Sequence, residues 1–126
     1  MPEIIITTIP HARQRYDTVG DWQWRGDDLI ITISDTGSWR SNMAVAIHEL
    51  CEVALCKDKG ITQIDVDKFD MGPGLQSNDP GDLPNAPYRD QHCFATAVER
   101  MLIAAFGMAW SEHEILCNSL SYKAKA

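Results

Sequence analysis

The hydrophobic and polar positions along the chain separate a first quarter rich in β-branched residues from a remainder with helical spacing. Ile4 to Ile9 and Leu29 to Ser34 predict two strands. Pro10 ends the first, and the turn sequence Asp35-Thr36-Gly37 ends the second. Trp22-Gln23-Trp24 predicts a further short strand between them. We therefore expect the strands to lie within about residues 3–34.

Three later segments have the apolar spacing and the end signals of helices. Ser41 or Asn42 is a suitable N-cap for the first, and Gly60 is its natural stop. The second ends at Gly107, and the third opens with an S-x-x-E capping box that begins at Ser111. The predicted helices cover about residues 42–57, 88–106 and 111–120.

The segments that join the helices are less regular. Residues 61–69 fit either a short helix or an irregular crossing. Residues from about 70 to 87 form a predicted loop with four prolines and three glycines, and its aspartates are expected to be solvated. The tail from Ser121 to Ala126 is expected to fray.

These elements predict one α+β domain over residues 1–126, in which a small antiparallel or mixed N-terminal sheet packs against two main helices and a short C-terminal helix. We expect the tryptophans to seal the sheet against the helices, and His11 and His113 to be surface residues. The predicted core face of the second helix consists of Phe94, Ala97, Val98, Met101, Leu102 and Ala105.

Charge and composition exclude some classes of function. The net charge is −7, from 18 acidic and 11 basic residues, so binding to a nucleic-acid backbone is not expected. No apolar run approaches the length of a membrane span, and the N-terminus lacks the pattern of a signal peptide. We therefore expect a cytoplasmic protein without a membrane partner.

The four cysteines are not spaced as a zinc finger. In an intracellular protein the expected state is buried free thiols. One variant stays open, in which Cys51, three residues after His48, or Cys93, next to His92, replaces a carboxylate as a metal ligand.

The sequence His48-Glu49-Leu50-Cys51-Glu52 is the strongest candidate for chemistry. Residues four apart lie on one face of a helix, so His48 and Glu52 can present a nitrogen and an oxygen to one divalent transition metal. The flanking residues are apolar, which predicts a largely buried helix whose charged groups need partners. A metal is one such partner, and an arginine or a solvent-filled cleft is another.

This HExxE sequence, together with a later histidine, resembles two groups of proteins. The order of strands, HExxE helix, loop and histidine-bearing helix is similar to a minimal zincin-type metallopeptidase fold. The segments His48 to Glu52 and Ala86-Pro87-Tyr88-Arg89-Asp90-Gln91-His92 are also similar to small uncharacterised phage and prophage proteins with an HELxE…APYxxxH pattern. The second likeness implies that the protein is phage-encoded and acts in the host cytoplasm.

The zincin resemblance implies a zinc ion and a role for each residue. His48, Glu52 and His92 would be the metal ligands, with Glu52 in the place of the second histidine of HExxH, and Glu49 would be the general base. Tyr88 lies one helical turn before His92 and is predicted to polarise a substrate carbonyl or to orient the ligand. Glu99 is predicted to accept a hydrogen bond from the far nitrogen of a histidine ligand.

The function predicted from these residues is hydrolysis of a peptide or another amide bond by metal-activated water. One alternative is a non-enzymatic phage-type interaction or inhibitor protein, in which the cluster is a structural metal site or a polar network and the acidic surface docks onto a partner. A second alternative is a magnesium-dependent nucleotide pyrophosphatase that uses Glu49, Glu52, Glu99 and Asp90.

Overall fold

A computed structural model describes residues 2–121 and confirms the α+β class. The tail expected to fray beyond Ser121 lies outside the described residues. The regular elements of the described part are β1 (Ile4–Ile9), η1 (His11–Arg13), β2 (Gly20–Arg25), β3 (Asp28–Ser34), α1 (Trp39–Asp58), α2 (Gln63–Asp70), η2 (Pro80–Asp82), α3 (Arg89–Ala105) and α4 (Trp110–Asn118).

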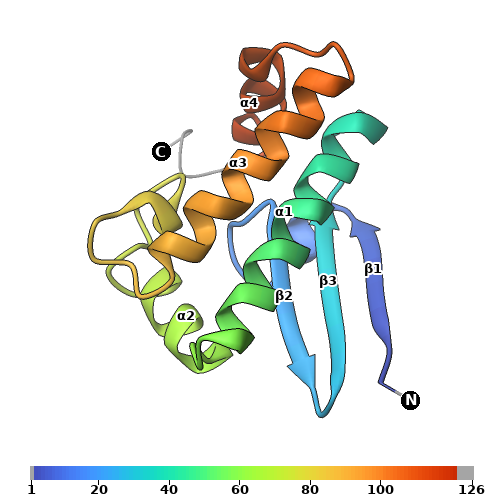
Figure 1. Cartoon of the computed structure of the whole chain (residues 1–126). Helices are drawn as coiled ribbons and strands as arrows, with labels where there is room; N and C mark the ends of the chain where they lie inside the picture. Colours follow the sequence, from blue (N-terminus) through green and yellow to red (C-terminus); the bar gives the residue numbers. More distant parts are fainter. Residues whose placement is uncertain (1, 122–126) are drawn as a thin grey trace.

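The described strands form one mixed sheet in the order β1-β3-β2 (Figure 1). Strand β3 is central, pairing in parallel with β1 and antiparallel with β2. Gly26 turns the β2–β3 hairpin with a φ of 61°, a conformation that an L side chain rarely adopts. The segment between β1 and β2, which includes η1, carries the chain from one edge of the sheet to the other.

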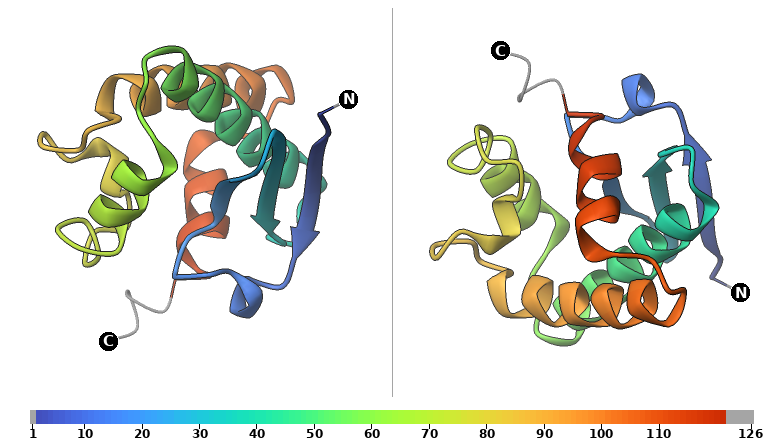
Figure 2. Two further views of the ribbon diagram at one scale, coloured as in Figure 1. Left: turned by 90° about the horizontal axis from the view of Figure 1, so that it is seen from below. Right: turned by 90° about the horizontal axis from the view of Figure 1, so that it is seen from above.

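Helix α1 covers the sheet, and α3 runs alongside α1 (Figures 1 and 2). The centre of the core is formed by Ile31 and Ile33 of β3 with Val53 and Cys56 of α1, none of which is more than 1% exposed. Strand β1 lies outside this cover, and Ile4 is 63% exposed. The polar residues of the two helices meet between α1 and α3, and β2 reaches this layer because Trp22 Nε1 donates a hydrogen bond to Glu52 at 3.1 Å.

The helix boundaries differ from the predicted ones at their N-termini. Helix α1 begins three residues early because Ser38 is its N-cap and accepts a hydrogen bond from the Ser41 amide at 3.3 Å. Helix α4 already begins at Trp110, so the predicted capping box at Ser111 is wrong. Most of residues 61–69, for which the sequence allowed either a short helix or an irregular crossing, belong to α2, which starts with a capping box at Thr62.

The predicted core face of α3 is wrong. Phe94 and Met101 are 57% and 64% exposed, and Ala97 and Ala105 are exposed as well. The buried residues of this helix are His92, Ala95, Glu99 and Ile103. The prediction from hydrophobicity chose the wrong side of α3. His92 and Glu99 have polar partners on α1 and α4, and these contacts offset the free-energy cost of burying them.

Two further predictions about side-chain burial are only partly correct. Trp22 is 4% exposed and seals the sheet as expected, but Trp39 is 60% exposed and stacks edge-on against Phe106. Cys56 is a buried free thiol, whereas Cys93 is exposed.

Within residues 2–121, no single helix has the length and apolar character needed to cross a membrane. Helices α3 and α4 reach that length and composition only when they are taken together, across a 117° bend.

We expect Ile31→Ala to lower the free energy of unfolding by about 2–5 kcal/mol, because Ile31 is fully buried at the centre of the sheet. Ile5→Ala is the matched control on the edge strand, where Ile5 is 40% exposed, and should cost less than about 1 kcal/mol. Urea denaturation of both variants measures the difference. Equal losses would contradict the position of the core.

Candidate metal centre

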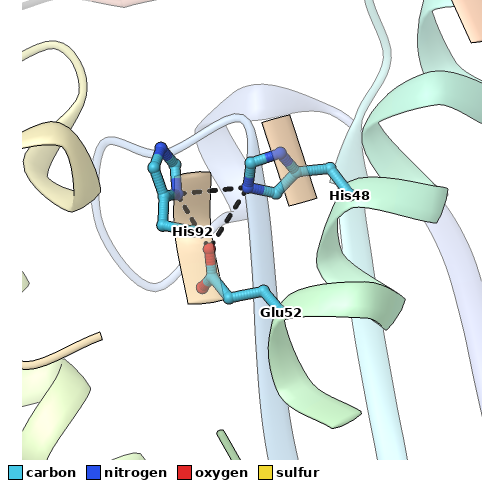
Figure 3. A group of neighbouring side chains, drawn as sticks. All are labelled: His48, Glu52 and His92. Carbon is cyan, nitrogen blue, oxygen red and sulfur yellow. Dashed lines mark hydrogen bonds and ion pairs between the residues drawn. The ribbon is translucent and has the colours of Figure 1, made fainter. Parts of the chain in front are cut away.

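Three side chains converge between α1 and α3 (Figure 3). His48 Nε2 lies 3.2 Å from Glu52 Oε2 and 3.2 Å from His92 Nδ1, and His92 Nδ1 lies 2.9 Å from the same Glu52 oxygen. The three residues are 5–8% exposed. The structure therefore brings together the three residues predicted as ligands, in a group able to hold a metal ion.

Local structure explains how the three atoms meet. His48 and Glu52 are one turn apart on α1, so their side chains lie on the same face. His92 lies in the first turn of α3, which the chain enters directly from the loop that contains η2. The backbone at Gly81 in that loop lies so close to the His92 ring that a Cβ there would come within 2.3 Å of Cγ. The contact between Gly81 and His92 limits the orientations of the ring.

A carboxylate lies beside the far nitrogen of each histidine. Glu99 Oε1 is 2.7 Å from His48 Nδ1, and Asp79 Oδ1 is 2.9 Å from His92 Nε2. Both are ion-pair distances, although neither contact has the angle of a hydrogen bond. A carboxylate only accepts, so it favours the tautomer that carries the proton on the far nitrogen. In neutral histidines this leaves lone pairs on His48 Nε2 and His92 Nδ1, both directed towards Glu52.

The donor set and spacing fit a divalent metal. A tetrahedral zinc ion with bonds of about 2.0–2.1 Å holds its ligand atoms roughly 3.3 Å apart, close to the spacing of this group. Two imidazole nitrogens and a carboxylate oxygen are also a donor set that zinc accepts. Without a cation or a proton among them, three acceptors this close would repel one another.

The carboxylates around the two histidines stabilise positive charge on the imidazole rings. Burial disfavours the imidazolium of His48, but Glu52 and Glu99 outweigh it and raise its pKa well above the usual value. Burial likewise opposes protonation of His92, yet Asp79 and Glu52 raise its pKa to about 10. Burial opposes ionisation of Glu52, but the two histidines lower its pKa to about 2.

Glu49, the predicted general base, lies beside the ligand group and is not part of it. Its Oε2 is 3.9 Å from His48 Nε2, and the residue is 6% exposed. Its side chain lies against β2, where a Cβ on Gly20 would come within 2.8 Å of the carboxyl group. Burial and the charge of Glu52 raise the pKa of Glu49 well above its usual range.

The hydroxyl of Tyr88 is engaged in a different interaction from the predicted ones. It donates a short hydrogen bond to Asp70, whose other oxygen accepts a hydrogen bond from Tyr16 at 2.8 Å. Its ring is nearly perpendicular to that of His92, at an interplanar angle of 87° with centroids 6.0 Å apart. Burial raises the pKa of Asp70 to about 6. Asp70 was expected among the solvated loop acids but ends α2 and is 7% exposed, so that prediction is wrong.

His113 is not a surface residue, contrary to the prediction. It is 1% exposed, and its Nε2 lies 2.5 Å from Glu99 Oε2, while Ser41 Oγ lies 2.9 Å from its Nδ1. Glu99 therefore lies between His113 and His48, at ion-pair distance from His48 Nδ1 but without the angle of the predicted hydrogen bond. Sequence reasoning missed His113 because its partners are 14 and 72 residues away.

His11 is also not a simple surface residue. It is half-buried and contacts Ser34 at 2.8 Å and Asp17 at 2.7 Å, away from the metal-ligand group.

Neither Cys51 nor Cys93 belongs to the convergent group of His48, Glu52 and His92. Cys93 is exposed and Cys51 is half-buried. A fourth protein ligand from either cysteine, which would mark a closed structural site, is therefore not part of the arrangement.

A cavity of about 350 Å³ opens beside the three convergent side chains. Nine acidic residues contribute to its wall, and among the described residues that line it there is no lysine or arginine. Arg15 pairs with two of these acids, Asp21 and Asp67, and acidic side chains still outnumber basic ones at the wall. The cavity places Glu49, Tyr88 and Asp70 around one space that is continuous with the candidate ligands.

In comparisons with models of protein families, with curated proteins and with solved structures, no match to this chain was found.

The pKa of His92 predicts how the stability of the metal-free protein depends on pH. The folded value of about 10 lies above the unfolded value of about 6.5. The resulting stabilisation is complete below about pH 6.5 and is lost as the pH rises towards 10, by on the order of a few kcal/mol. Urea denaturation in the presence of a chelator, at several pH values, measures this loss. His92→Gln should flatten the pH dependence, and an unchanged slope in that variant would contradict the assignment.

Proposed function

We propose that this protein binds a divalent transition metal, best matched by zinc, through His48, Glu52 and His92, and uses it to hydrolyse an amide bond. One observation carries the proposal: three possible ligand atoms lie within 3.2 Å of one another at the wall of a cavity. A ligand set of two histidines and one glutamate leaves one position of a tetrahedral zinc ion open, as in catalytic sites.

The residues around this set support hydrolysis over a structural role. A bound zinc ion would acidify water and polarise a substrate carbonyl. Glu49 is suited to receive the proton from that water, because its carboxyl group lies beside His48 and is held by the close approach of Gly20. Burial raises the pKa of Glu49 above its ordinary value, which makes its carboxylate a stronger proton acceptor.

A peptide or protein is the proposed substrate. The acidic wall of the cavity would attract a positively charged segment of it. Tyr88 is held by Asp70 at the same cavity, which suits a positioning role beside His92. In the magnesium-dependent alternative, Glu99 would have to face a phosphate chain. Its two oxygens instead lie against His48 and His113, so the zinc-based proposal has the better support.

Metal analysis tests the first half of the proposal. We expect untagged protein supplied with zinc to retain about one ion per chain, because the three donors form one site. His48→Ala and His92→Ala should each reduce this to less than about a tenth. His11→Ala, which removes a half-buried histidine outside the group, is the matched control and should keep its zinc. Wild-type protein that binds no zinc would overturn the proposal.

Glu49→Gln tests the second half. The amide keeps the size of the side chain but cannot accept the proton, so hydrolysis should fall by about 10²–10⁴-fold with the zinc content unchanged. The measurement is cleavage of a fluorescence-quenched peptide library that includes basic sequences. Glu112→Gln, an exposed acid of α4, is the control. Zinc-loaded wild type that cleaves nothing in the library, or a Glu49→Gln variant as fast as wild type, would reject the peptidase activity.

A further inference from the structure

A second set of possible ligands lies on the other side of the His92 ring. Asp79 Oδ1 is 2.9 Å from His92 Nε2, and Asp82 Oδ1 is 3.5 Å from it. One ligand atom from each of the three residues lies within 4.8 Å of the other two. Asp79 is the N-cap of η2 and Asp82 is its last residue, so this short helix presents both carboxylates to the same ring nitrogen.

The ring nitrogen between these carboxylates is buried and has no hydrogen-bond partner. His92 is only 7% exposed, whereas the side chains of Asp79 and Asp82 are 50% and 57% exposed. The nitrogen is at ion-pair distance from two carboxylates but has the angle of a hydrogen bond to neither. This arrangement suits a cation that binds to the nitrogen and both carboxylates at once.

The backbone holds this arrangement in place. Gly81, between the two aspartates, is buried against the imidazole, and a Cβ there would come within 2.5 Å of Nδ1 and 2.3 Å of Cγ. Only glycine allows this approach, which brings the flanking carboxylates to the ring. The second set is therefore built into the fold and is not an incidental group of surface acids.

We propose that Asp79, Asp82 and His92 Nε2 form a second divalent-cation site, and that the His92 ring bridges it to the first site. The second site itself stands on its own contacts, and only the bridge rests on the proposed function. Two half-exposed carboxylates and solvent complete the coordination, so this site should bind more weakly than the buried one. When both ring nitrogens hold ions, the remaining ring proton is released to solvent.

Zinc titration followed by equilibrium dialysis tests the site. We expect wild type to bind two ions per chain, the second at least about tenfold more weakly. Asp79→Asn with Asp82→Asn should keep only the tight site, while His48→Ala with Glu52→Gln should keep only the weak one. Asp27→Asn with Asp58→Asn, an exposed pair outside both sets, is the control with the same change in charge. It should bind both ions.

Two results would overturn the second site: a single ion bound by wild type, or a second ion that survives loss of Asp79 and Asp82. A wild type that binds only the weak ion would reject the proposed function and leave the second site standing. Circular dichroism of each variant confirms that loss of binding is not loss of fold.

Electron paramagnetic resonance with Cu²⁺ in place of zinc tests the bridge. Two copper ions joined through one imidazole ring interact magnetically, so the signal of the doubly loaded protein should be weaker than the sum of the singly loaded variants. A spectrum equal to that sum would overturn the sharing of His92 and assign the second ion to the two aspartates alone.

Discussion

Contact between the polar faces of α1 and α3 is the constraint on which the rest of the structure depends. Each helix buries carboxylates and histidines where a helix pair normally buries aliphatic side chains. Isolated charges in that position would be prohibitively costly, so each group needs a partner of opposite charge or a hydrogen bond. His48 of α1 lies between Glu52 of its own helix and Glu99 of α3. His92 of α3 in turn contacts Glu52 of α1. The two helices can meet in few other ways without leaving a charge unmatched.

Helix α4 and the central loop extend this network of paired groups outward. His113 contacts the free oxygen of Glu99, and Asp79 contacts the outer nitrogen of His92. Tyr16 and Tyr88 each donate a hydrogen bond to Asp70 at the end of α2. Elements distant in sequence are thus tied to one centre through polar contacts, while the aliphatic core under the sheet supplies the non-directional stabilisation.

The group of His48, Glu52 and His92 could be predicted from the sequence, whereas the residues that pack around it could not. His48 and Glu52 are related by helical spacing, which is a local property, and the later position of His92 on a helix could be inferred from a resemblance. Asp70 and His113 are related to the centre only through tertiary packing, and neither has a local signal. The face of α3 was misjudged for the same reason, since Phe94 is more hydrophobic than His92 and only the fold shows which of them has partners.

Two glycines have a consequence for how this sequence can vary. Gly20 and Gly81 have no side chain to bind or react, yet each lies in direct contact with a residue of the centre, Glu49 and His92 respectively. In a saturation-mutagenesis library selected for function, we expect Gly81 to be as intolerant as His92, and Gly20 to tolerate a side chain only where Glu49 can shift. Gly26, which has open space around its missing Cβ, would be limited only by its backbone angle. A survey of tolerated substitutions would thus locate the group around His92 and Glu49 even from glycines, which have no side chain to take part in its chemistry.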